Sequence, residues 1–305
     1  MPMKLDVISI LDLKDDLEDV IASAMRLKGG ALKDAFPLKG KTLAMIFEKS
    51  STRTRVSFEA GMAQLGGHAL NLSPKELQLG RGETIADTAK VLSRYVDCIM
   101  YRAFDHKMML DLAKNATIPI INALDDVEHP CQTVADLMTV LEHKKRFKGV
   151  KLAYVGDGNN VCNSLMLGSA IVGMDFVSAN PEGYGPDKRL VKTAAEMAKK
   201  KGASFELLSD PKVAVKNADV IYTDTWVSMG MEEEAKERLK VFQPYQVNSA
   251  LVKRAKKDCI VMHCLPAHRG HEITDEVMDG PNSVIFDQAE NRMHTEKAIL
   301  LMLIR

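Results

Sequence analysis

A cationic, hydroxyl-rich segment, Ser51-Thr52-Arg53-Thr54-Arg55, offers the clearest chemistry in the chain. It follows the apolar run 42–47 and precedes apolar positions with helical spacing, so we expect a turn between a strand and a helix. Unpaired N–H groups and the positive end of the helix dipole favour a phosphate at such a turn, and two arginines add charge-assisted hydrogen bonds. The segment therefore predicts a phosphate site. The alternative is that Ser51 or Thr52 only caps the helix while both arginines lie in water.

A second set of hydrogen-bond donors lies in the segment Glu128-His129-Pro130-Cys131-Gln132. The proline fixes the entry into a helix, and the imidazole of His129 and the amide of Gln132 can donate from one side of that entry. Such donors suit a carbonyl oxygen that gains negative charge during acyl transfer. Arg102 ends another expected strand, and ligands bind at the carboxyl edge of parallel sheets, so Arg102, His129 and the 51–55 turn should face one side. An ordinary polar helix turn and a solvated arginine are the alternatives.

Three turns in the second half of the chain suit an amino-acid substrate. Asn160 follows a glycine-containing turn, where its amide could bind a carboxylate. Asp224 and Ser228 lie four residues apart on a loop that ends in glycine, and they could hold an ammonium group. Cys264 ends a strand just before a Leu-Pro step, where we expect a strained or cis peptide, and its thiol could line an amine pocket. A capped turn and a small buried hydrophobe are the alternatives.

Neither a nicotinamide cofactor nor a metal is expected. The turn before Asn160 has part of a dinucleotide-binding pattern, but Val161 stands in place of the last glycine, and the next strand ends at Asn180 without an acid for a ribose. The histidines at 263, 268 and 271 suggest zinc, yet no H-x-x-x-H pattern or cysteine pair accompanies them.

Charge, cysteine content and hydropathy exclude several classes of protein. Lysine plus arginine equals aspartate plus glutamate at 41 each, so no overall field favours nucleic acid or an anionic membrane. Five cysteines without a C-x-x-C pair argue against a disulfide framework. No apolar stretch has the length of a signal peptide or a membrane span. We expect a cytoplasmic protein with neither nucleic-acid nor membrane partners.

Short aliphatic runs alternate with longer segments of helical period, which is typical of an α/β fold with parallel sheets and crossover helices. The basic run 143–146 and Gly149 indicate a helix end, after which a new series of strands begins. We expect two domains, 1–147 and 148–288, each a parallel sheet flanked by helices, with a C-terminal helix, 289–305, that returns to the first domain. The expected strands are 42–47, 68–72, 97–101, 118–122, 151–155, 174–179, 203–208, 219–223, 259–263 and 283–286.

Taken together, four segments resemble the ornithine-specific branch of the aspartate/ornithine carbamoyltransferase family. In chain order they read Ser-Thr-Arg-Thr-Arg, His-Pro-Cys-Gln, Asp-x-x-x-Ser-Met-Gly and His-Cys-Leu-Pro, and the resemblance runs from about residue 40 to the C-terminus. The first two segments are shared across a family that binds carbamoyl phosphate, and the last two distinguish the acceptor. The resemblance implies transfer of the carbamoyl group to the side-chain amine of L-ornithine, giving L-citrulline and phosphate, as part of arginine metabolism. It also implies that no cofactor is needed.

The resemblance assigns roles to individual residues. It implies a catalytic set of Arg102, His129, Asp224 and Cys264. The implied carbamoyl-phosphate contacts are Ser51, Thr52, Arg53, Thr54, Gln78, Arg102, His129, Pro130, Cys131, Gln132, Cys264, Leu265 and Arg292. The implied ornithine contacts are Asn160, Asp224, Ser228 and Met229. Gln78 would complete the site of a neighbouring subunit, so the resemblance implies a homotrimer or a multiple of trimers.

Other functions remain open at this level. Putrescine, an N-acylornithine or aspartate could replace ornithine as acceptor, although aspartate would require cations where this chain has Asp224 and Ser228. Aspartate-specific members also typically show His-Pro-Leu-Pro-Arg where this chain has residues 263–267, His-Cys-Leu-Pro-Ala. A dinucleotide-dependent oxidoreductase is disfavoured by Val161, and a noncatalytic phosphometabolite-binding protein is disfavoured by the acceptor residues.

Overall fold

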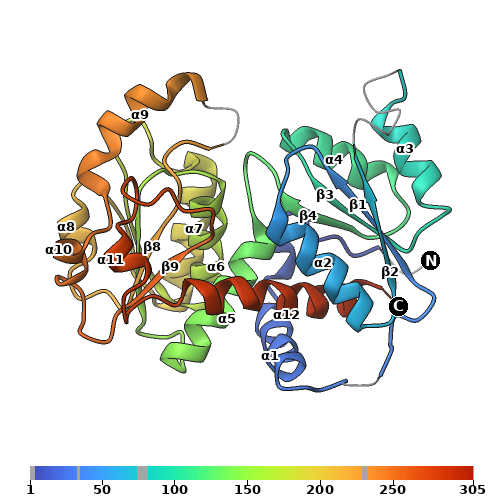
Figure 1. Ribbon diagram of the computed structural model, residues 1–305, viewed down its shortest axis with the longest axis horizontal. Helices are drawn as coiled ribbons and strands as arrows, with labels where there is room; N and C mark the ends of the chain where they lie inside the picture. Colours follow the sequence, from blue (N-terminus) through green and yellow to red (C-terminus); the bar gives the residue numbers. More distant parts are fainter. Residues whose placement is uncertain (1–3, 33–34, 74–81, 229–231, 305) are drawn as a thin grey trace. The chain divides into compact units, whose positions relative to one another are not determined.

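The computed structural model describes residues 4–32, 35–73, 82–228 and 232–304 of the chain. The chain divides into two compact units, one formed by Met1–Ala135 with Asn291–Arg305 and the other by Asp136–Glu290. Each unit contains one sheet whose strands are all parallel. The predicted fold class, α/β with a parallel sheet and flanking helices in each of two domains, is confirmed (Figure 1). The domain boundaries proposed from the sequence stay a prediction.

The first unit is built on a four-stranded sheet in the order β2-β1-β3-β4. Along β1, alternate side chains point to opposite faces, and Ala44 and Ile46 pack with residues of α3 and α4 such as Ala89 and Leu112. β2 is an edge strand and is largely exposed. The elements are η1 (Ile10–Leu13), α1 (Leu17–Lys28), β1 (Thr42–Phe47), α2 (Thr52–Gln64), β2 (His68–Leu72), α3 (Ile85–Leu92), β3 (Cys98–Arg102), α4 (His106–Asn115), β4 (Ile120–Leu124) and the start of α5 (Pro130–Lys144).

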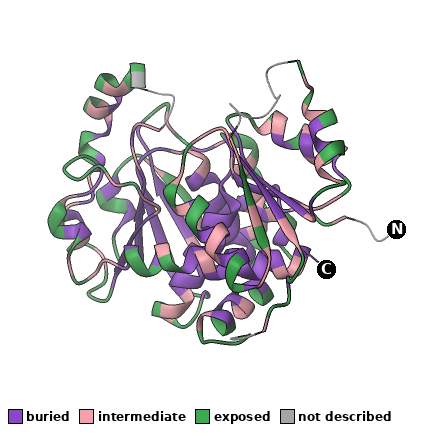
Figure 2. Cartoon of the chain, turned by 45° about the vertical axis from the view of Figure 1, so that its right-hand side comes forward, coloured by how far each residue is buried: buried purple, intermediate pink, exposed green. Residues whose placement is uncertain are grey.

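The second unit is built on a five-stranded sheet in the order β7-β6-β5-β8-β9. α6 and α7 lie side by side, and α6 is buried over nearly its whole length, as expected for a helix with no polar face (Figure 2). The elements are β5 (Lys151–Val155), α6 (Asn160–Val172), β6 (Asp175–Ala179), α7 (Lys188–Lys201), β7 (Phe205–Leu208), α8 (Pro211–Ala214), β8 (Val220–Thr223), η2 (Glu232–Glu234), α9 (Ala235–Phe242), η3 (Gln243–Tyr245), α10 (Ser249–Val252), β9 (Ile260–His263), α11 (Asp275–Met278) and the start of α12 (Ile285–Leu303).

One predicted strand is wrong. Residues 283–286 form no strand: Ser283 makes a single bridge with Val261, and α12 begins at Ile285. A short apolar run cannot be distinguished from the start of a buried helix by its period alone, and here good helix formers follow it.

The predicted return of the C-terminal helix is confirmed. From Asn291 onward α12 belongs to the first unit. Its Lys297 ammonium donates to Gln64 Oε1 of α2 at 2.9 Å, and Asn291 Oδ1 accepts from Lys28 of α1 at 2.8 Å. The return places Arg292 among the helices of the first unit.

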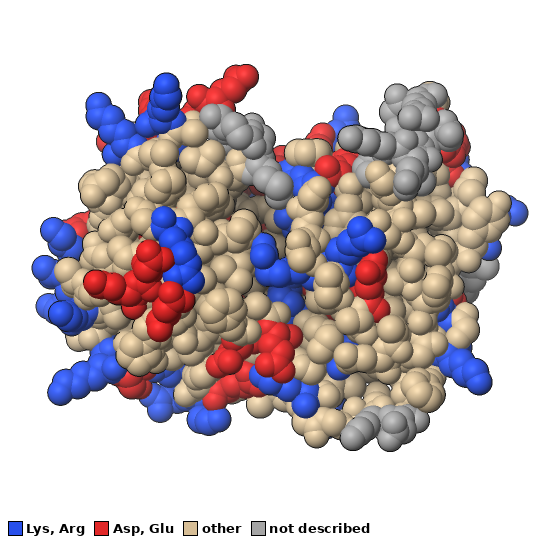
Figure 3. All heavy atoms as spheres, viewed as in Figure 1, with Lys and Arg blue, Asp and Glu red and all other residues tan. Residues whose placement is uncertain are grey.

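The surface carries charge of both signs, as the formal net charge of zero requires (Figure 3). Arg269, for example, pairs with Asp275 at 2.8 Å and with Asp279 at 2.5 Å. Within the described residues, none of the helices combines the length and the apolar character that a membrane crossing needs.

We expect Leu165→Ala in α6 to lower the free energy of unfolding by about 2–5 kcal/mol, because Leu165 is fully buried and its truncation leaves a cavity. Val213→Ala is the matched control, since Val213 is 53% exposed, and it should change the free energy by less than about 0.5 kcal/mol. Urea denaturation followed by circular dichroism measures both. Similar losses in the two variants would contradict the assignment of α6 to the core.

Candidate active site

The turn after β1 has the geometry of an anion site. Ser51 is the N-cap of α2, and its hydroxyl oxygen accepts from the Thr54 backbone N–H at 3.2 Å, which leaves the other first-turn N–H groups directed outward. An open cavity of about 340 Å³ adjoins this turn. Its lining residues are Phe47, Ser50, Ser51, Thr52, Arg55, Asn71 and Ser73. The capping role and the phosphate role predicted for this segment are thus compatible.

A buried guanidinium links three elements of the first unit. Arg292 of α12 donates from Nη1 to Gln132 Oε1 of α5 at 2.7 Å, and from Nη2 to Thr54 Oγ1 of α2 at 3.2 Å. Arg292 is 2% exposed, and Thr54 and Gln132 are each 1% exposed. Three residues that the sequence assigned to one site are therefore in direct contact, although they are far apart in the chain.

His129 lies in the field of the same cationic group. Burial lowers its pKa well below the usual range, and the positive charges of Arg292, Arg102 and Arg53 lower it further. The imidazole is consequently neutral at physiological pH, with one N–H to donate. A neutral donor beside arginines suits a carbonyl oxygen that becomes negative, because the ring keeps its proton while it stabilises the charge.

The segment before His129 is held by one buried carboxylate. Asp125 accepts from the backbone N–H groups of Val127 and Glu128, at 2.8 and 2.7 Å. It also accepts from Asn122 Nδ2 at 2.8 Å and lies 2.6 Å from His106 Nδ1. These bonds fix the path of the chain into Pro130, the first residue of α5. The thiol of Cys131 points into the interior, where burial raises its pKa to about 12.

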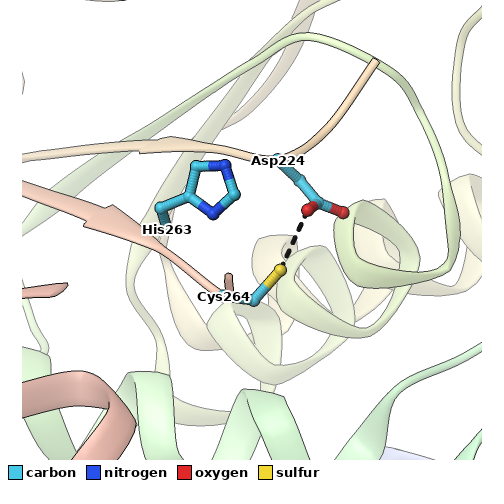
Figure 4. A group of neighbouring side chains, drawn as sticks. All are labelled: Asp224, His263 and Cys264. Carbon is cyan, nitrogen blue, oxygen red and sulfur yellow. Dashed lines mark hydrogen bonds between the residues drawn. The ribbon is translucent and has the colours of Figure 1, made fainter. Parts of the chain in front are cut away.

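In the second unit, Asp224 and Cys264 are in contact (Figure 4). The Cys264 thiol donates to Asp224 Oδ1 at 2.9 Å, and Asp224 Oδ2 accepts from Asn159 Nδ2 at 2.7 Å. Asn159 is also the N-cap of α6, because its Oδ1 accepts from the N–H groups of Val161 and Cys162. Asp224 is 5% exposed, so a buried carboxylate with two neutral donors faces any amine bound here.

His263 lies beside this pair but is not placed to ligate a metal. Its Nδ1 accepts from the Leu265 N–H at 2.8 Å, which puts the ring proton on Nε2, directed at Glu272 Oε1 at 3.1 Å. Asp224, His263 and Cys264 offer ligand atoms within 4.8 Å of one another. Both nitrogens of the imidazole are already engaged, however, so His263 would have to break at least one buried hydrogen bond to bind an ion.

The Leu265–Pro266 peptide is cis, as the sequence predicted, and Leu265 has a φ of +60°. This backbone is held by the hydrogen bond from Leu265 N–H to His263. The Leu265 carbonyl belongs to the proposed carbamoyl contacts, which stay a prediction.

Arg238 of α9 anchors the loop that carries Asp224 and Ser228. Its Nε donates to the Trp226 carbonyl at 2.5 Å, and its guanidinium pairs with Asp157 in the turn after β5. Arg238 is 4% exposed, and its guanidinium lies over the ring of Tyr184. Burial raises the pKa of Asp157 to about 6, against the opposing effect of Arg238.

Of the remaining predicted site residues, the structure describes some and not others. Asn160, the first residue of α6, and Ser228, in the loop after β8, are half-buried, and Asn160 Oδ1 accepts from the Val161 N–H at 2.9 Å. Gln78 and Met229 lie outside the described residues. Sequence reasoning missed Asn159, Arg238, Glu272 and Glu296; only Asn159 carried a local signal, as a capping residue before a helix.

Comparison with known proteins defines the class. Residues 5–142 match the aspartate/ornithine carbamoyltransferase carbamoyl-P binding domain, and residues 148–303 match the Asp/Orn binding domain of the same enzymes. Parallel sheets with an anion site in one unit and a carboxylate–thiol pair in the other fit this two-domain class. The chain belongs to the aspartate/ornithine carbamoyltransferase family.

Individual relatives are similar over most or all of the chain. The anabolic ornithine carbamoyltransferase of Pyrococcus furiosus is 63% identical over 267 residues, covering 88% of this chain and 85% of the relative. The catabolic ornithine carbamoyltransferase of Thermoplasma volcanium is 56% identical over 301 residues, 99% of each. A solved structure of ornithine carbamoyltransferase from Pyrococcus furiosus aligns with a TM-score of 0.95 at 57% identity, covering 98% of this chain and 96% of that one.

We expect His263→Phe to lower the melting temperature by more than about 3 °C, because it leaves the Leu265 N–H without its acceptor and removes one of the two hydrogen bonds to Glu272 Oε1. His271→Phe is the matched control, since His271 is exposed. Differential scanning calorimetry measures both. Equal melting temperatures would show that the ring of His263 does not support this turn.

Proposed function

We propose that this chain transfers the carbamoyl group of carbamoyl phosphate to the side-chain amine of L-ornithine, giving L-citrulline and phosphate. The single observation that carries the proposal is the division of chemistry between the two units. The N-terminus of α2 lies in the first unit, within the residues that match the carbamoyl-P binding domain. The buried Arg292 guanidinium joins it there from α12, a helix that falls within the match to the Asp/Orn binding domain. A buried carboxylate in contact with a thiol lies in the unit that matches the Asp/Orn binding domain.

The phosphate is bound at the N-terminus of α2. Ser51, Thr52, Arg53 and Thr54 supply hydroxyls, backbone N–H groups and a guanidinium, and Arg102 and Arg292 add positive charge. Charge-assisted bonds of this kind are short and strong, and they stabilise the phosphate as it leaves with the bonding electron pair. Gln78 keeps its proposed role as a phosphate contact in a neighbouring subunit.

One set of residues polarises the carbonyl of the carbamoyl group, and a second set orients the group. Arg102, Thr54 and the neutral imidazole of His129 donate to the carbonyl oxygen, which becomes an oxyanion in the tetrahedral intermediate. Gln132 and the carbonyl groups of Cys264 and Leu265 contact the NH₂ end of the carbamoyl group, and Pro130 and Cys131 are further carbamoyl-phosphate contacts. The reaction needs no covalent intermediate with the enzyme and no cofactor, because orientation and oxyanion stabilisation supply the catalysis.

The ornithine is held by Asn160, Asp224, Ser228 and Met229. Its side-chain amine has an ordinary pKa near that of lysine, about 10.4, and only the neutral form attacks the carbonyl carbon. Asp224 and Cys264 orient that amine. Proximity to the arginines of the carbamoyl-phosphate site would lower the amine's pKa, because a second positive charge there is unfavourable.

The metabolic role and the assembly of the protein are part of the same proposal. Relatives named anabolic and catabolic are both similar to this chain, so we assign the reaction to arginine metabolism without choosing between synthesis and breakdown. We propose a cytoplasmic homotrimer, or a multiple of trimers, from the role assigned to Gln78. The partners are the two small-molecule substrates.

The proposal is tested by supplying carbamoyl phosphate with ornithine, putrescine, N-acetylornithine or aspartate in separate assays and measuring the carbamoylated product. We expect kcat/KM for ornithine to exceed that for each other acceptor by at least about 10²-fold, because a site built for polar end groups rejects analogues that lack them. A preference for putrescine, N-acetylornithine or aspartate would replace the assigned acceptor, and no product with any of the four would refute carbamoyl transfer.

Two variants separate the roles of the units. We expect Arg53→Ala to weaken binding of phosphonoacetamide, the methylene analogue of carbamoyl phosphate, by at least about tenfold, because a charge-assisted contact is lost. Asp224→Ala should leave that binding within about twofold and lower kcat/KM for ornithine by about 10²-fold. Calorimetry and the citrulline assay measure these quantities.

The controls are Arg94→Ala and Asp15→Ala, both at exposed positions, which should match the wild type. Equal loss of phosphonoacetamide binding in the Arg53 and Asp224 variants would contradict the assigned division of roles.

A further inference from the structure

We propose that Glu296 is a positioning residue that clamps the Arg292 guanidinium and makes the binding of carbamoyl phosphate take up a proton. The inference rests on the proposed function, because Arg292 is one of the carbamoyl-phosphate contacts assigned there. It concerns a residue that belongs to none of the four recognised sequence segments.

The clamp is seen in the geometry of α12. Glu296 lies one helical turn after Arg292, and its side chain is fully buried. Its Oε1 accepts from both Nε and Nη2 of Arg292, at 3.1 and 2.7 Å. With that edge of the guanidinium held, Nη1 reaches Gln132 and Nη2 also reaches Thr54. Glu296 therefore sets the direction in which Arg292 presents its charge.

The second carboxyl oxygen is the site for the proton. Glu296 Oε2 is buried and has no hydrogen-bond partner among the described residues. The nearby Ser57 hydroxyl donates instead to the Arg53 carbonyl, at 2.6 Å. A proton from solvent or buffer added to Oε2 would neutralise the carboxylate while Oε1 still accepts from Arg292.

Three elements face the Glu296 side chain. α12 presents Arg292, α2 presents the uncharged Ser57, and α5 presents the thiol of Cys131. Burial and the charge of Glu296 raise the pKa of Cys131 to about 12, so the thiol stays protonated. Arg292 is thus the charge that balances Glu296.

The charge balance between Arg292 and Glu296 decides whether phosphate binding takes up or releases a proton. Burial raises the pKa of Glu296 to about 7, while Arg292 and the nearby Ser57 hydroxyl oppose the rise. A bound phosphate dianion adds negative charge beside Arg292, which raises the pKa of Glu296 further. Above pH 7 the complex therefore holds more protons than the free protein. Binding takes up part of a proton there, and the affinity falls as the pH rises.

The test is isothermal titration calorimetry with phosphonoacetamide in two buffers of different ionisation enthalpy, between pH 6.5 and 8.5. The buffer dependence gives the number of protons taken up per site. We expect the wild type to take up at least about 0.3 proton more than Glu296→Gln near pH 8. The ligand's own ionisation contributes equally to both and cancels. The Kd of the wild type should rise with pH more steeply than that of the variant.

The matched control is Glu196→Gln on α7, at an exposed position, which should behave as the wild type does. If Glu296→Gln does not fold, the wild type is tested alone: after correction for the protons that phosphonoacetamide releases when it binds as a dianion, its proton uptake must be at least about 0.3 near pH 8. No excess in the wild type, or the same excess in Glu296→Gln, would overturn the role of Glu296. A wild type that makes citrulline but shows no excess would overturn this inference alone, and one that does not bind phosphonoacetamide would overturn the proposed pocket as well.

Discussion

Burying charge without leaving it unpaired is the constraint on which both units depend. An isolated buried ion is strongly unfavourable, and the buried ions that shape the two sites have a partner of opposite sign or several hydrogen bonds. Arg292 has Glu296, Arg238 has Asp157, and Asp125 has four donors around it. These contacts hold the side chains in place before any substrate arrives. An active site that is already oriented spends less free energy on reorganisation when charge develops in the transition state.

The parallel topology explains why these groups collect where they do. In the first unit, Ser51 follows β1, Arg102 ends β3 and His129 follows β4, and these three strands are neighbours in the sheet. In the second unit, Asn160, Asp224 and Cys264 follow β5, β8 and β9, which are also neighbours. Since all strands run the same way, residues from distant parts of the chain reach the same edge of each sheet.

Local patterns therefore predicted most of the fold. β1 and β2 have the predicted bounds, because their apolar runs are short and flanked by polar turns. The 283–286 strand failed, because Val284, Ile285 and Phe286 fit either a strand or the start of a helix. The buried hydrogen-bond partners that support the site residues could not be predicted. The contacts of Asn159 with Asp224 and of Arg238 with Asp157 form only in the folded chain. In the sequence, Glu296 cannot be distinguished from an exposed helical glutamate, because its burial is known only from the structure.

Asn159 fixes the distance between the start of α6 and Asp224 in the second unit. Its side-chain amide caps α6 through Oδ1 and donates to Asp224 through Nδ2. The first turn of that helix and the carboxylate therefore cannot shift independently. Asn160, the next residue, is the proposed partner of the amino-acid end of the substrate. The span available to the acceptor is consequently set by a side chain that need not touch it. Discrimination between amines of different chain length would then belong to Asn159 as much as to the residues in contact with the substrate.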